Sequence, residues 1–160
     1  MSNRDEIRRL ALAVGNGLTA SIEVHDKIIQ KSATFKSLVK NLFGRAPTLS
    51  QLLDDSERLV PMWAAIHEQL EAFRRISYLS MTPDEQSYFD LLSRYVMAVK
   101  EAVRALVERQ RLLNEISRRG GNIPMTWESF QEKERLYRSA VAEYMLIGRE
   151  LNAAALMIFD

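Results

Sequence analysis

Proline and glycine, which most often interrupt regular structure, are scarce in this chain and fall mostly into three short stretches. The stretches are 44–47, 81–83 and 120–124. In the four longer segments that remain, apolar residues recur at alternating spacings of three and four, which indicates amphipathic helices. The sequence therefore predicts an all-α fold, an antiparallel up-down four-helix bundle. We expect one domain, 1–160, with long helices over about 5–43, 49–80, 83–119 and 127–159.

Two of the predicted helices begin with capping-box sequences. Thr82 is expected at the N-cap, Pro83 at the first helical position and Glu85 at the third, an arrangement that satisfies free backbone N–H groups. Thr48 and Gln51 form a similar pair at the start of the preceding helix.

Three residues inside the predicted helices weaken the pattern. Pro61 is expected to kink or restart the helix over 49–80, because proline lacks the N–H that a helix interior needs. Gly15 and Gly17 are expected either to soften the first helix or to allow a neighbouring helix to approach it closely.

The composition excludes several classes of function. The chain has no cysteine, which excludes disulfides, Cys-ligated zinc and thiol catalysis. Its 22 Lys and Arg against 21 Asp and Glu leave a net charge of +1, so a nucleic-acid partner is not indicated. The apolar run at 10–14 is too short for a secretory signal, and no stretch of about 20 apolar residues exists. We expect a cytoplasmic protein.

Each predicted helix has a polar residue in its apolar stripe that falls, in an antiparallel bundle, at about the same height as one on each of the other three. These residues are Ser32, Ser56, Gln110 and Glu134. A buried polar layer of this kind can fix the register of the helices. In a second interpretation they line a polar cavity of a ligand carrier or an enzyme, where burial raises the pKa of Glu134. In a third, Glu134 lies in solvent.

Only two histidines are present, and neither indicates a metal site. His25 is expected near the middle of the bundle beside Trp63 and Tyr144, as a core histidine bonded to the Tyr144 hydroxyl. His67 is expected on the surface with Glu71. A di-iron bundle carries Glu three residues before His, and neither histidine meets that requirement. No metal or cofactor is predicted.

The stretch 27–45 is basic, has no acidic residue and carries its charges beside an apolar face. Its charged residues are Lys27, Lys31, Lys36, Lys40 and Arg45. Lysine stems can cover the edge of a bundle core while their ammonium groups stay in water. The same pattern suits a helix that lies on an anionic membrane surface, so both interpretations stay open.

The second half of the predicted helix 127–159 is apolar on more than one face, and such an excess often marks an interface. The candidate interface residues are Tyr144, Ile147, Leu151, Leu156, Ile158 and Phe159. The favoured function is a non-enzymatic interaction or self-assembly module, with a homo-oligomer, preferably a dimer, or a protein partner. The alternatives are peripheral membrane binding through 27–45 and, below it, the ligand carrier or enzyme.

Overall fold

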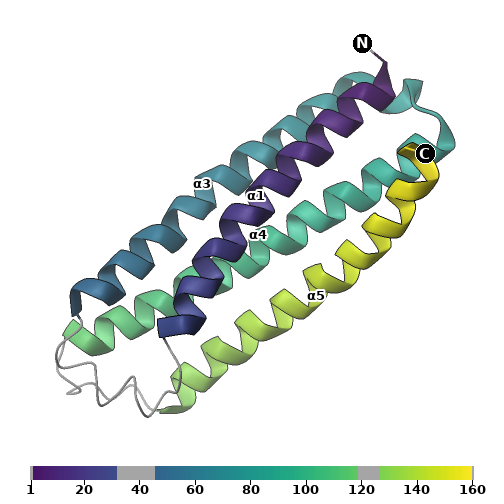
Figure 1. The fold of residues 1–160 in the computed structure, drawn as a ribbon. Helices are drawn as coiled ribbons and strands as arrows, with labels where there is room; N and C mark the ends of the chain where they lie inside the picture. The colour runs from purple at the N-terminus through teal and green to yellow at the C-terminus, as the bar shows by residue number, and fades with distance from the viewer. Residues whose placement is uncertain (1, 32–45, 119–126, 160) are drawn as a thin grey trace.

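The computed structural model describes residues 2–31, 46–118 and 127–159, and within them the chain is almost entirely helical (Figure 1). The elements are α1 (Asn3–Lys31), α3 (Ala46–Ser77), the 3-10 turn η2 (Tyr78–Ser80), α4 (Pro83–Arg118) and α5 (Trp127–Phe159). The predicted all-α four-helix bundle is confirmed. The predicted continuation of the first helix over 32–43 lies outside the described residues.

Successive helices run in opposite directions, so the start of α1, the α3–α4 turn and the end of α5 lie at one end of the bundle (Figure 1). Two hydrogen bonds fix this end: the Asn3 side-chain amide donates to the carbonyl and to the hydroxyl of Ser80, both at 3.1 Å. They join the first turn of α1 to η2.

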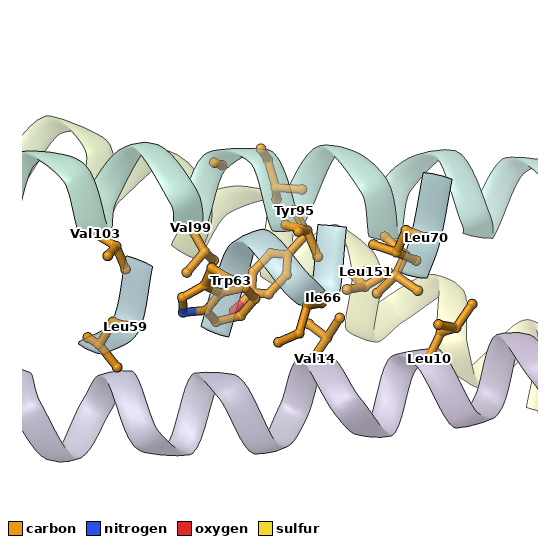
Figure 2. Close-up of a cluster of buried hydrophobic side chains, with 14 of the residues drawn as sticks. Leu10, Val14, Leu59, Trp63, Ile66, Leu70, Tyr95, Val99, Val103 and Leu151 are labelled. Carbon is orange, nitrogen blue, oxygen red and sulfur yellow. The ribbon is translucent and has the colours of Figure 1, made fainter. Parts of the chain in front are cut away.

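α4 is the central helix of the fold. It packs most extensively against α5 and α3 and less against α1, and side chains are buried along most of its length. The core contains ten labelled residues of Figure 2: Leu10, Val14, Leu59, Trp63, Ile66, Leu70, Tyr95, Val99, Val103 and Leu151. All four helices contribute to this cluster, so the bundle has one main core.

The capping box at the start of α4 is confirmed. The Thr82 hydroxyl accepts from the Glu85 N–H at 3.3 Å, and the Glu85 carboxylate accepts from the Thr82 N–H at 2.8 Å. The second predicted box is wrong, because α3 begins at Ala46, two residues before Thr48. Pro47 suits the first turn of a helix, where its missing N–H has no partner to lose.

Pro61 does not end or restart a helix, because α3 continues through it without a break. The residue lies on the exposed side of α3. The carbonyl that loses its helical partner there can bond to water instead, which lowers the cost of an interior proline.

The two glycines of α1 have different surroundings. A Cβ atom added to Gly17 would lie 2.8 Å from Ile66 Cδ1 and 3.3 Å from Trp63 Cζ2, so this glycine lets α1 approach α3 closely. A Cβ atom added to Gly15 would meet nothing within 4 Å. Close helix approach therefore explains Gly17 and not Gly15.

Candidate functional site

The six candidate interface residues occupy different environments. Ile147 and Leu151 are buried in the core, and Tyr144, Ile158 and Phe159 are partly buried against it. Leu156, with 66% of its surface exposed, is the one member that is available to another molecule without rearrangement. Most of the candidate interface residues of α5 are therefore buried against other helices of the same chain.

A different set of α5 residues faces outward. Ala142, Leu146, Arg149, Ala153 and Leu156 recur at spacings of four and three, and all are exposed. Met145 and Met157 flank this stripe, and Met157 is 88% exposed. We call the apolar members the outer α5 face: Ala142, Met145, Leu146, Ala153, Leu156 and Met157. In the sequence, the outer α5 face is visible as a second apolar stripe, which runs beside the core stripe of the same helix.

Two opposite charges lie at the middle of the outer α5 face. Arg149 and Glu150 are both exposed, and neither forms an ion pair with another described residue. Elsewhere on α5, Arg135 binds Glu132 at 2.7 Å and Arg138 binds Glu134 at 2.8 Å. The central charges of the face are thus available to an external partner.

The predicted polar layer is divided between the core and its edge. Ser56 and Gln110 are buried, Glu134 is about three-quarters buried, and Ser32 lies outside the described residues. The Ser56 hydroxyl donates to the Leu52 carbonyl of its own helix at 2.7 Å. The Gln110 carbonyl oxygen accepts from the buried Arg109 at 2.9 Å.

Glu134 is held by two arginines. Arg109 of α4 forms an ion pair with one carboxylate oxygen, and Arg138 donates to the other at 2.8 Å. Burial alone would raise the pKa of Glu134, but the hydrogen bonds and charges of Arg109 and Arg138 lower it below its ordinary value. This direction is opposite to the raised pKa that the second interpretation, with Glu134 in a polar cavity, requires.

His25 forms its hydrogen bond with Tyr137, two turns of α5 before the expected Tyr144. The two rings lie 5.7 Å apart between centroids. Burial raises the pKa of Tyr137, so its hydroxyl stays neutral in the physiological range. The other expected neighbour, Trp63, donates its indole N–H to Ser21 of α1 at 2.9 Å. The partly buried histidine thus links α1 to α5 through Tyr137 and not through the expected Tyr144.

An open cleft of about 690 Å³ lies across α3, α4 and α5, and His67 is one of its lining residues. Arg74 occupies one side, where it binds Asp90 at 2.9 Å and Glu71 at 3.6 Å. The same guanidinium lies over the rings of Tyr78 and Phe89. The charges of Arg74 and Asp90 satisfy each other, so this wall of the cleft is a helix–helix contact.

The basic stretch is described only in part. Lys27 is about half exposed and lies 3.6 Å from Asp55 of α3. Lys31 ends α1, and Lys36, Lys40 and Arg45 lie outside the described residues. The prediction of an anionic surface stays a prediction, and the one described side chain pairs with an acid of the bundle.

No helix in the described ranges is long and apolar enough to cross a membrane. The same ranges contain no group of three or more His, Asp or Glu side chains that is suited to hold a metal ion. Comparisons with family models, with curated proteins and with solved structures find no match to the chain.

Proposed function

We propose that this chain is a non-enzymatic self-assembly module, in which the outer α5 face packs against the same face of a second copy. The carrying observation is the row of exposed apolar side chains on α5, with Leu146 and Leu156 at 59% and 66% exposure. Exposed apolar rows of this kind mark interaction sites on soluble proteins more often than scattered single residues do. The cysteine-free composition fits a reducing compartment, and the proposal places the dimer in the cytoplasm.

The face is self-complementary in shape when two copies pack antiparallel. A two-fold axis at the height of Leu151 sets Leu146 of each copy against Leu156 of the other. The same axis sets Arg149 against Ala153, whose small side chain leaves room for the arginine stem. Isologous pairing of one patch with itself is the commonest arrangement in homo-oligomers.

The face is also self-complementary in charge. In this register Glu150 of the second copy lies three residues along the helix from the position facing Arg149, a rise of about 4.5 Å. The arginine side chain spans that distance, so the dimer gains two symmetric ion pairs from charges that are unpaired among the described residues. This match is the reason to choose a second copy as the occupant.

The size of the face sets the expected affinity. Residues 142–159 span about 27 Å of helix, and a strip about 10 Å wide gives roughly 300 Å² for each copy. A standard interface buries about 800 Å² for each partner. We therefore expect a reversible dimer that dissociates on dilution into the micromolar range.

The test is the native mass of the full chain, measured by light scattering and by sedimentation velocity over a hundredfold range of concentration. The expected result is a shift from monomer to dimer. Leu146→Glu and Leu156→Glu should each shift the midpoint at least tenfold towards the monomer, because they bury an unpaired charge. Leu12→Glu, an equally exposed leucine on α1, is the matched control. A monomer at every concentration would overturn the proposal.

A charge exchange tests the antiparallel register. Arg149→Glu should weaken the dimer, because it places like charges together, and the double variant Arg149→Glu with Glu150→Arg should restore it. Weakening without restoration would reject the register, although dimer formation itself would still be measured by the leucine variants.

A further inference from the structure

The methionine side chains of the described residues differ widely in their exposure. Met145 and Met157 are 51% and 88% exposed, and both belong to the outer α5 face. Met97 of α4 is 43% exposed and lines the open cleft across α3, α4 and α5. Met81 is buried, with 6% of its surface exposed. The two most exposed thioethers in the described ranges therefore lie on the surface proposed for assembly.

The proposed dimer places these two thioethers at the edges of its contact. Met145 and Met157 are separated by about 120° around the helix axis, so they lie on opposite sides of the apolar stripe. Each is six residues from Leu151, so the two-fold axis brings Met145 of one copy to the height of Met157 of the other. Each end of the contact then has the paired Leu146 and Leu156 in the middle and a methionine on either edge. Flexible methionine side chains can fold over such leucines and cover them.

Peroxide converts a thioether into a polar group in one balanced step. The sulfur lone pair attacks one oxygen of hydrogen peroxide, the O–O bond breaks and an S–O bond forms. Sulfur is oxidised to the sulfoxide, and the second oxygen leaves as water with both hydrogens. The chain has no cysteine, so methionine carries all of its side-chain sulfur. A sulfoxide oxygen is hydrated on an exposed side chain, but it loses that water when an apolar surface covers it.

We infer that Met145 and Met157 are oxidation sites that control the proposed dimer. Peroxide oxidises both thioethers in the monomer, and the sulfoxides weaken the pairing of two outer α5 faces. The inference rests on the proposed function and adds a form of regulation to it. Because the dimer covers the thioethers that the oxidant must reach, assembly and oxidation oppose each other by mass action. Reduction by two thiols, which become a disulfide while the oxygen leaves as water, reverses the change.

The test measures the monomer–dimer midpoint of the full chain before and after oxidation with hydrogen peroxide. Light scattering and sedimentation velocity give the midpoint, and circular dichroism checks the fold. Trypsin separates the three exposed methionines onto the peptides 95–100, 139–149 and 150–160, so mass spectrometry locates each added oxygen. We expect oxidation to raise the midpoint at least about tenfold, and a methionine sulfoxide reductase with a dithiol to restore it. An unchanged midpoint after complete oxidation of both thioethers would overturn the inference.

A double variant tests whether these two thioethers are responsible. Met145→Leu with Met157→Leu keeps the face apolar, and its midpoint after peroxide should equal its own midpoint before peroxide, although its other methionines still react. Met97→Leu is the matched control, because Met97 is also exposed but lies in the cleft, and this variant should stay as sensitive as the wild type. A double variant that remains fully sensitive would assign the effect to another residue and overturn the inference.

The inference and the proposed function can fail separately. Met145 and Met157 should be oxidised several times more slowly above the midpoint concentration than below it, whereas the rate at Met97 should not depend on concentration. A dimer that protects neither α5 thioether would overturn the inference and reject the outer α5 face as the contact, although self-association itself would stand. A chain that is monomeric at every concentration would overturn the proposed function and, with it, the inference.

Discussion

α1 contacts α3 and α5 in two very different ways. On the α3 side, Gly17 lies against Trp63 and Ile66, and the Trp63 indole donates to Ser21, so the helices are in direct contact. On the α5 side, His25 bonds to Tyr137 near one end, and Arg8 lies over the Phe159 ring at the other. Between those links is an open hollow of about 160 Å³.

The difference shows how one residue type produces opposite packing on one helix. Gly15 and Gly17 are two positions apart, which separates them by about 200° around the helix axis. Gly17 faces a large ring and removes a clash, whereas Gly15 has empty space beside it. The role of each glycine is therefore set by the side chains of the facing helix and not by its own conformational freedom.

Truncation of the tight side should have the largest effect on stability. Trp63 is fully buried, and Trp63→Ala should lower the free energy of unfolding by about 3–5 kcal/mol through the cavity it leaves. Tyr144→Ala, on the α5 side and only partly buried, should cost less than half as much. Urea unfolding followed by circular dichroism measures both. Equal losses would show that the α5 side is packed as tightly as the α3 side.

An intermediate effect is expected at the α4–α5 contact, where Glu134 binds the buried Arg109. Glu134→Gln should cost about 1–3 kcal/mol, because Arg109 loses its counter-charge. Because folding lowers the pKa of Glu134, its stabilising contribution is complete above the ordinary value of 4.5 and is lost as pH falls below it. Urea midpoints between pH 7 and pH 3 should therefore converge for the wild type and the variant.

Glu132→Gln is the matched control for that series. Glu132 is also paired with an arginine, Arg135, but it is about half exposed, and exposed pairs contribute about 0–1 kcal/mol. A Glu132 variant as unstable as the Glu134 variant would contradict the role given to the buried arginine.

The smallest expected effect compares the two glycines directly. Gly15→Ala should raise the free energy of unfolding by about 0.5–1 kcal/mol, since alanine favours the helix and finds open space. Gly17→Ala should lose that gain, because its Cβ atom must displace Ile66 and Trp63. Thermal and urea unfolding of the two variants give the difference. A stabilising Gly17→Ala would show that α1 can move away from α3 at no cost.

The helix ends and the core stripes could largely be predicted from the sequence, because they depend on local chemistry. Thr82 and Glu85 fix the start of α4 as expected, and the α5 stripe that contains Phe130, Tyr137 and Leu151 faces the core. Thr48 was predicted to cap α3, but the helix begins two residues earlier, at Ala46. Pro47 is compatible with this earlier start, because proline is well tolerated in the first turn of a helix.

The candidate surfaces were harder to predict, because they depend on how evenly four helices pack. Ile147 lies outside the predicted core stripe of its helix, but the wide contact between α4 and α5 buries it. The pKa of Glu134 is lowered and not raised by folding, because Arg109, a long side chain on another helix, binds its carboxylate. The sequence pattern of α5 does not show this contact. The hollow beside Gly15 left no pattern in the sequence.

The link between His25 and Tyr137 joins residues 112 positions apart, whereas the α3–α4 turn joins neighbours. Contacts between distant residues carry the larger loop-closure entropy and tend to form late in folding. The α1–α5 seam should therefore close last during folding and open first in local unfolding. Amide hydrogens of α1 that face this seam should therefore exchange before those of α4.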